Sequence, residues 1–480
     1  MTSVIIPISQ IHQDCLTRLF LNKTIFEHIK NNFPEKTNFY SISQEVDQRI
    51  SGTININVAK NNKGPLQTIE SAISHLSIDE NDEVFIHYSD LLVLFDYKKF
   101  KSTIDSTKDT ILFISKHQTP FRLDSQDYSF VKNVSGQKIQ IGHKKSFTQI
   151  PHSEDVSCGL YYFKTFKLLK DFIKKSISLN HFHTESIFDQ SDIQKETYGD
   201  VINLELDSKS KIRLFENWYH YFDVAKISEQ RIPDIEYIVP LAGKGSRFAS
   251  ANYATPKHLL PIEDMTLIEF TAGHVKEAKK YHFITLDDKA DYLDRFKPLA
   301  LRKILTPTEG QACSVYEAVK HIADDSEILV GVCDNCAEFD IEAFNKLKVQ
   351  SDVIYFSFTN HPNMMTRPEH YGWLKTDNQN MVTGVSVKTP ISKTPLKDQA
   401  IVGLFYFKKA LMFKKAYQEL LNQCDKINGE YYVDSLVPYL IKENLKVSSF
   451  PVKHFISLGT PNEYESFFYF KSCYQELSSR

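Results

Sequence analysis

The second half of the chain alternates apolar runs with amphipathic stretches. Residues 237–241 and 328–332 are almost wholly apolar, which is typical of strands buried on both faces of a parallel sheet. Residues 312–322, between them, carry apolar side chains at helical spacing. Strands that alternate with helices predict an α/β fold with a mostly parallel sheet and helices on both of its faces.

The first half of the chain shows matching segments in the same order. A strand with Pro7 near its end corresponds to the strand that ends near Pro240. Each half then has an apolar strand followed by an aspartate, Asp90 or Asp334. The same number of residues separates each aspartate from a Gly-Leu-aromatic-Tyr-Phe-Lys segment.

A further match involves the pattern Glu-x-Tyr-x-Asp, which occurs at 196–200 and again at 430–434. From each pattern, an equal number of residues leads to a position in the expected closing strand, held by Asp223 in one half and Ser457 in the other. The equal spacing predicts that Asp223 and Ser457 occupy corresponding places.

These matches predict an internal duplication, with two tandem Rossmann-like α/β domains of ordinary domain size. The domains are expected to cover residues 1–232 and 233–480, with the joint in a polar stretch around Pro233. A length of 480 residues agrees with this, because one hydrophobic core rarely organises so long a chain.

Composition indicates a water-soluble globular protein. The chain is 42% hydrophobic and 24% charged with a formal net charge of −3, which gives no support for nucleic acid or an anionic membrane as a partner. No apolar run approaches the ~18–20 residues of a membrane span, and the amino terminus lacks the features of a signal peptide. The 7 cysteines show no framework of pairs, so reduced thiols and a cytoplasmic location are expected.

Chemistry-bearing residues concentrate in the loop that follows residues 237–241. The loop Gly243-Lys244-Gly245-Ser246-Arg247 combines two cations with glycines, which let the backbone approach a ligand closely. Pro256-Lys257 then adds a second lysine behind a rigid residue. The combination predicts a socket for a triphosphate. It is neither the phosphate loop that ends in Gly-Lys-Ser/Thr nor a dinucleotide fingerprint with its third glycine.

This socket resembles that of the sugar-nucleotidyltransferase family, the nucleoside-diphosphate-sugar pyrophosphorylases. The motifs that carry the resemblance are Gly243-x-Gly245-Ser246-Arg247-Phe248 and Pro256-Lys257-x-Leu259-Leu260-Pro261, and it extends to about Phe470. It implies two domains of the GT-A-like nucleotidyltransferase fold. It also implies that a phosphate monoester attacks the α-phosphorus of a nucleoside triphosphate and releases pyrophosphate, with Mg²⁺ as the cofactor.

The resemblance also implies roles for particular residues. The catalytic cations are expected to be Arg247, Lys257 and Lys388, and the Mg²⁺ ligand is expected to be Asp334. Residues expected to contact the nucleotide are Leu241, Ala242, Gly243, Lys244, Gly245, Ser246, Glu309, Gly310 and Gln311. Residues expected to contact the acceptor are Gly372, Trp373, Glu430 and Tyr432.

Two positions depart from the family pattern. Val387 replaces a glutamate before the acceptor-binding lysine, and Ser457 replaces a metal-binding aspartate. A second metal ligand must then come from elsewhere, with Glu430 as a candidate.

Within the family, the socket and the segment around Glu430 are most similar to small capsule or surface-polysaccharide cytidylyltransferases. This similarity implies CTP or UTP as the donor. It implies a sugar phosphate or a small polyol or amino-alcohol phosphate as the acceptor, and it leaves a homo-oligomer open.

The first half of the chain lacks the socket. The segment after its first strand is shorter than in the second half and contains neither Gly-x-Gly nor Pro-Lys. We therefore expect a degenerate, non-catalytic domain. Asp90 and Asp223 could form a residual ligand or metal site in this domain, or they could be ordinary surface carboxylates. The two alternatives are about equally expected.

Two other functions compete with the transferase. A nucleotide-sugar-dependent glycosyltransferase of the related fold would need an Asp-x-Asp metal motif and no Gly/Arg/Lys loop, the reverse of the second half. A regulatory or scaffolding protein of the same fold fits the first half but not the second.

Overall fold

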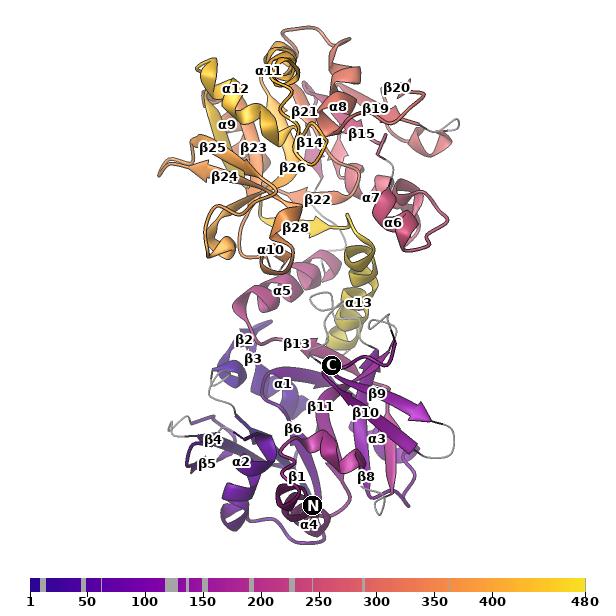
Figure 1. Ribbon diagram of the computed structural model, residues 1–480, viewed down its shortest axis with the longest axis vertical. Helices are drawn as coiled ribbons and strands as arrows, with labels where there is room; N and C mark the ends of the chain where they lie inside the picture. Colours follow the sequence, from indigo (N-terminus) through magenta and orange to yellow (C-terminus); the bar gives the residue numbers. More distant parts are fainter. Residues whose placement is uncertain are drawn as a thin grey trace. The chain divides into compact units, whose positions relative to one another are not determined.

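The computed structural model, drawn in Figure 1, describes residues 1–8, 14–44, 49–61, 63–116, 128–134, 138–148, 154–189, 194–223, 229–243, 245–286, 290–361 and 363–479. These residues form two compact units. The first consists of Met1–Tyr219 and Phe468–Arg480, and the second of His220–Phe467. Each unit has its own nine-stranded sheet among the described residues.

The sheet of the second unit is parallel around its first strand. β15 (Glu236–Pro240) pairs in parallel with β19 (Lys280–Thr285) and β21 (Ile328–Val330). The other strands are β20 (Leu299–Lys303), β23 (Val353–Phe358), β24 (Gly372–Thr376), β25 (Val382–Val387), β26 (Gln399–Phe407) and β27 (Val447–Pro451). β26 runs antiparallel to both β21 and β23, so the sheet is mixed.

Both faces of this sheet are buried. Because successive strand residues point to opposite faces, Tyr237 and Val239 belong to one buried cluster and Ile238 to another. The first cluster includes residues of α7 (Leu267–Ala272) and α9 (Ile341–Gln350). The second includes residues of α8 (Gln311–Val319), α11 (Ala410–Asn422) and α12 (Val437–Lys442). Helices therefore cover both faces, as the apolar pattern predicts.

Shorter elements complete the second unit. β22 (Asn335–Glu338) and β28 (His454–Ser457) form an antiparallel ribbon beyond the end of β21. α6 (Ser246–Ser250) and η6 (Lys257–Leu259) follow β15. The remaining elements are β14 (Gln230–Arg231), β16 (Pro261–Ile262), β17 (Met265–Thr266), β18 (Val275–Lys276), η7 (Asp291–Leu293), α10 (Asn363–Thr366), η8 (Pro368–His370), η9 (Pro395–Lys397), η10 (Asp434–Leu436) and the beginning of α13 (Pro461–Ser478).

The first unit is built from strands and helices of the same kinds. Its strands are β1 (Thr2–Pro7), β2 (Leu19–Phe20), β3 (Lys23–Thr24), β4 (Asn38–Gln44), β5 (Ile54–Val58), β6 (Glu83–His87), β7 (Leu91–Leu94), β8 (Thr110–Lys116), β9 (Ser129–Val134), β10 (Lys138–His143), β11 (Asp155–Phe163), β12 (Lys195–Tyr198) and β13 (Ile202–Glu205). Its helices are η2 (Cys15–Thr17), α1 (Ile25–Asn31), α2 (Pro65–Ala72), η3 (Ile73–His75), α3 (Tyr97–Thr103), α4 (Phe166–Ser178), η5 (Thr184–Asp189) and α5 (Lys209–Asp223).

The two sheets have the same strand order. The first reads β5-β4-β1-β6-β11-β8-β12, and the second reads β20-β19-β15-β21-β26-β23-β27. A hairpin is added at β11 in one and at β26 in the other, and the ribbon of β7 and β13 matches that of β22 and β28. The fold is therefore α/β, with two Rossmann-like domains of one topology.

The topology corrects one part of the sequence alignment. Glu196 lies in β12, which pairs with β8, whereas Glu430 lies in the turn before η10. Asp223 ends helix α5, and the residue that stands where Ser457 stands is Glu205, because Glu205 pairs with Leu91 as Ser457 pairs with Asn335. The equal spacing that starts at Glu196 and Glu430 was therefore coincidental. The equal spacing that starts at Asp90 and Asp334 agrees with the topology, because it leads to Gly159 in β11 and Gly403 in β26, which hold the same place in the two sheets.

The limits of the compact units differ from the expected joint after residue 232. Helices α5 and α13 each continue across a unit limit, so the domain limits 1–232 and 233–480 stay a prediction. Within the first unit, Phe470 of α13 stacks on Trp218 with ring centroids 5.2 Å apart. None of the described helices is both long and apolar enough to cross a membrane.

Candidate active site

The loop after β15 contains a glycine in a left-handed conformation. Leu241 and Ala242 are buried, Gly243 is exposed, and Lys244 lies outside the described residues. Gly245 has φ of 59° and ψ of 27°, a left-handed conformation that favours glycine, and it precedes α6. A Cβ atom on Gly245 would lie 3.7 Å from the Cβ of Lys257, so the loop and Lys257 are neighbours. Ser246 and Arg247, the first residues of α6, are exposed.

Lys257 and Asp334 form an ion pair at the carboxyl ends of the central strands. Asp334 follows β21, Lys257 begins η6, and the ammonium of Lys257 donates a hydrogen bond to the Asp334 carboxylate. Both side chains are partly buried, at 16% and 23% exposure. Burial alone would lower the pKa of Lys257, but the Asp334 carboxylate outweighs it and raises that pKa. The lysine is therefore held in its charged form beside the loop.

A second carboxylate lies next to Asp334. A Cβ atom on Gly459 would lie 3.1 Å from Oδ2 of Asp334 and 3.5 Å from Oε2 of Glu463. Glu463 also accepts a 2.9 Å hydrogen bond from the hydroxyl of Thr460. Ser457 is near the same place, because it pairs with Asn335, the residue after Asp334. Two carboxylates and a hydroxyl are hard oxygen donors, so this group of side chains fits Mg²⁺.

Arg247 and Lys388 act electrostatically on the same surroundings. Burial lowers the pKa of His370 to about 4, and the charge of Arg247 adds to this effect. Burial also lowers the pKa of Lys388, with Arg247 again contributing, whereas the carboxylate of Asp434 opposes the shift. The structure thus brings Arg247 and Lys388, which are far apart in the sequence of the second unit, to one region.

The surroundings of Lys388 include residues of the loop 430–434. Lys388 donates a 2.7 Å hydrogen bond to the His370 carbonyl, and its Nζ lies 5.2 Å from the ring centroid of Tyr432. The carboxylate of Glu430 raises the pKa of Tyr432, although burial is the larger cause, and it opposes the lowering of the pKa of Lys388. Burial raises the pKa of Asp434 to about 6, with Lys388 opposing.

Gly372 and Trp373 lie next to the loop 430–434 and in the core, respectively. A Cβ atom on Gly372 would lie 2.1 Å from Oδ2 of Asp434, so glycine makes room for that carboxyl group. Trp373 has no exposed surface, and its indole nitrogen donates a 3.1 Å hydrogen bond to the Pro368 carbonyl. The Trp373 side chain therefore belongs to the core, and only its backbone remains for the acceptor contact that the sequence predicts.

The segment Glu309-Gly310-Gln311 leads into α8 as predicted, and it is joined to the loop before η10. Tyr431 donates a backbone hydrogen bond of 2.9 Å to Glu309 and accepts one of 3.0 Å from Ala312. A Cβ atom on Gly310 would lie 2.5 Å from the backbone of Tyr431. The expected base-reading segment and the expected acceptor loop are therefore held together.

Two residues of this site, Glu463 and Asp434, were not predicted from the sequence. Thr460-x-x-Glu463 is a Ser/Thr-x-x-Glu pattern at a helix start, and it indicates a cap rather than a ligand. Asp434 shares a motif with Glu430 and Tyr432, but its burial has no sequence signal.

The corresponding place in the first unit has different groups. Glu205, the counterpart of Ser457, is buried and lies 2.9 Å from the ammonium of Lys211. Lys211 also lies 2.8 Å from Asp207, and Tyr128 donates its hydroxyl hydrogen to Glu205. Residues 9–13, which replace the socket loop in this unit, lie outside the described residues.

Comparisons with known proteins return structural neighbours only. No protein-family model matches the chain, and no curated protein matches it. A nucleoside-diphosphate-sugar pyrophosphorylase from Vibrio cholerae RC9 is 24% identical with a TM-score of 0.42, over 48% of this chain and 98% of its own. An inositol-1-phosphate CTP transferase from T. maritima is 12% identical with a TM-score of 0.38, over 50% and 96%. HddC from Yersinia pseudotuberculosis is 15% identical with a TM-score of 0.37, over 50% and 99%.

Proposed function

We propose that the protein is a nucleotidyltransferase that transfers a nucleoside monophosphate from a nucleoside triphosphate to a small phosphate monoester and releases pyrophosphate. CTP or UTP is the proposed donor. A sugar phosphate or a small polyol or amino-alcohol phosphate, destined for a cell-surface polysaccharide, is the proposed acceptor. One observation carries the proposal: the Lys257–Asp334 ion pair lies beside the Gly245 loop, at the carboxyl ends of the central strands.

The cations of the socket are suited to the charge that moves in this reaction. Transfer of a phosphoryl-type group depends mainly on positioning and on stabilising negative charge. The loop amides around Gly245, with Arg247, would bind the departing pyrophosphate. Lys257, charged and partly buried, would contact the α-phosphate and the incoming phosphate, where charge is greatest.

Asp334 and Glu463 are the proposed holders of Mg²⁺, with the Ser457 hydroxyl beside them. Bound there, the ion would neutralise phosphate charge and orient the triphosphate. Glu463 thus takes the part for which the sequence suggested Glu430, because it lies against the same glycine as Asp334.

The acceptor side is proposed to centre on Lys388. Its ammonium, close to the Tyr432 ring and acted on by Asp434, would bind the acceptor phosphate. Glu430 and Tyr432 would contact the rest of the acceptor. Gly310 and Gln311, at the start of α8, would read the edge of the base.

We also propose that the first unit is a duplicated copy without this activity. The Glu205–Lys211 pair supports this, because both charges are buried and satisfied internally. Such groups are not available to a triphosphate.

The test is pyrophosphate release by the full chain with Mg²⁺, each of the four nucleoside triphosphates, and a panel of sugar 1-phosphates, polyol phosphates and amino-alcohol phosphates. We expect release with one donor and one acceptor class, and we expect mass spectrometry to identify the second product as the nucleoside-diphosphate derivative of the acceptor. The Lys257→Ala variant, purified in parallel, controls for contaminating enzymes. Release of nucleoside diphosphate from a nucleotide sugar, without pyrophosphate, would instead support a glycosyltransferase.

A further inference from the structure

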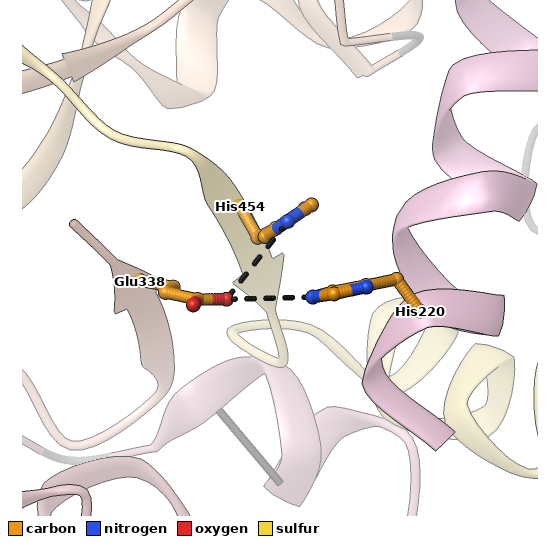
Figure 2. A group of neighbouring side chains, drawn as sticks. All are labelled: His220, Glu338 and His454. Atoms are coloured by element: carbon orange, nitrogen blue, oxygen red, sulfur yellow. Dashed lines mark ion pairs between the residues drawn. The ribbon is translucent and has the colours of Figure 1, made fainter. Parts of the chain in front are cut away.

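A group of side chains of the types that bind metal ions lies in the second unit, apart from Asp334. It consists of His220, Glu338 and His454, drawn in Figure 2. Nε2 of each histidine lies 3.9 Å from Oε2 of Glu338. One ligand atom from each residue lies within 4.8 Å of the others.

Secondary structure fixes two of these three side chains. Glu338 and His454 are directly paired residues of the antiparallel strands β22 and β28, so their side chains leave the same face of the ribbon. His220 comes from the last turn of α5, and its ring stacks on that of His454 with centroids 4.5 Å apart. The group thus combines a strand pair with one residue of a helix, as Figure 2 shows.

The ligand types and their geometry favour a zinc-class ion. Two imidazoles and one carboxylate are a ligand set that binds Zn²⁺ at about 2.0–2.2 Å, and tetrahedral coordination places such atoms roughly 3.4 Å apart. The observed separations need only small side-chain rotations to reach this value. A set of three protein ligands leaves a fourth position, and His220, at 45% exposure, opens the group to solvent.

The end of helix α5 adds a favourable field. His220 lies in the last turn of this 15-residue helix, where the aligned peptide dipoles of a helix favour a bound cation. The competing explanation is a pair of ion pairs between the two histidines and Glu338. The two explanations differ in whether a metal binds.

We propose that His220, Glu338 and His454 form a binding site for a divalent transition-metal ion of the zinc class. The site joins the last turn of α5 to the ribbon of β22 and β28. It is separate from the proposed Mg²⁺ position, because Asp334 precedes β22 and Glu338 ends it. The nitrogen ligands also distinguish it, since Mg²⁺ takes oxygen donors.

Titration of the full chain with Zn²⁺, and with Co²⁺ as a spectroscopic probe, tests the site. After chelator treatment and dialysis, we expect one Zn²⁺ per chain by calorimetry and visible absorption bands of tetrahedral Co²⁺ that Zn²⁺ displaces. His220→Ala and His454→Ala should each weaken Zn²⁺ binding by about tenfold or more, because each removes one of three ligands. His321→Ala, which removes an exposed histidine elsewhere in the same unit, should leave binding unchanged.

Thermal unfolding gives a second readout that needs no enzymatic activity. Excess Zn²⁺ should raise the midpoint of the wild-type protein and of His321→Ala, but not that of His220→Ala, because a ligand stabilises only the state that binds it. His220 is exposed, so its alanine variant is expected to fold. Equal Zn²⁺ binding by wild type and His220→Ala, or no binding by either, would overturn the proposal in favour of the ion pair.

Discussion

The two units have the same strand order but use charge differently at corresponding places. In the second unit, Lys257 comes from the loop after the first strand and meets Asp334, with both side chains partly exposed. In the first unit, Lys211 comes from helix α5 and meets Glu205, with side-chain exposures of only 11% and 3%. The Lys257–Asp334 pair lies beside the Gly245 loop, whereas Glu205 of the other pair also accepts a hydrogen bond from Tyr128.

This difference shows what topology alone does not decide. The fold brings an acidic side chain to the two-stranded ribbon in both units, Glu205 at the end of β13 and Asp334 just before β22. Whether that charge serves a ligand depends on which segment supplies its cation and how deeply the pair is buried. Breaking a buried ion pair leaves an uncompensated buried charge, which costs much free energy. A partly exposed pair can exchange its partner for a ligand at a lower cost in free energy.

The largest expected effect is that of Asp334→Asn. Loss of the hard anionic ligand should abolish Mg²⁺-dependent turnover, since an amide is a poor substitute. Initial rates across a Mg²⁺ titration would measure it, with circular dichroism to verify the fold. Unchanged Mg²⁺ dependence would mean that the ion is held elsewhere.

Lys257→Ala should lower kcat/KM by about 10²–10³, because it removes a cation aimed at developing phosphate charge. Arg247→Ala should have an effect of similar size. Lys346→Ala is the matched control, because it removes an exposed lysine on α9, and it should leave kcat/KM unchanged. Near-normal turnover in Lys257→Ala would remove this residue from the site.

Lys211→Ala should lower stability and leave turnover nearly unchanged. It leaves Glu205 buried without its ammonium partner, and such a loss costs about 3–5 kcal/mol of stability. Urea unfolding would show the loss, while turnover per folded molecule should stay within a few-fold of wild type. A variant with normal stability would show that the pair is not structural.

The raised pKa of Asp434 predicts a pH dependence of stability in the second unit. The folded protein keeps this proton up to about pH 6, whereas an unperturbed aspartate releases it near 3.8. Stability should therefore fall as pH rises through this window, by on the order of 3 kcal/mol at full shift. Asp434→Asn should lack this component when thermal midpoints at pH 4.5 and 7 are compared. Parallel pH profiles of the two proteins would contradict the assignment.

The smallest expected effect is that of Asp90→Ala. Asp90 precedes β7 as Asp334 precedes β22, but its unit lacks the Gly-x-Gly and Pro-Lys motifs. Turnover should remain within a few-fold of wild type, measured beside Asp334→Asn. Loss of activity in a correctly folded Asp90→Ala would mean that the first unit takes part in catalysis.

Apolar patterning was enough to predict the fold class. The runs at 237–241 and 328–332 correspond to β15 and β21, and the predicted helix at 312–322 corresponds to α8, which begins and ends earlier. Strand direction was not predicted for β26, because an apolar run has the same composition whichever way the strand runs. Spacing also misplaced Asp223, because helix and loop lengths changed independently in the two units.

The site was predictable where a motif precedes or follows a strand end. Lys257 and Asp334 meet because neighbouring parallel strands end at the same edge of the sheet. Glu463 was not predicted because its pattern also makes a helix cap. The burial of the Trp373 side chain was not predicted either, because burial cannot be read from a motif. The roles of the site residues stay predictions until activity is measured.

The close backbone contact between Gly310 and Tyr431 has a counterpart in the first unit, between Gly64 and Phe182. Gly64 has φ of 151°, Leu66 donates a 3.1 Å hydrogen bond to the Phe182 carbonyl, and a Cβ atom on Gly64 would lie 2.7 Å from that oxygen. A glycine that persists in the unit without a socket is required by chain packing. Loss of activity in Gly310→Ala would therefore report a disturbed backbone, and base recognition is better examined through the side chain of Gln311.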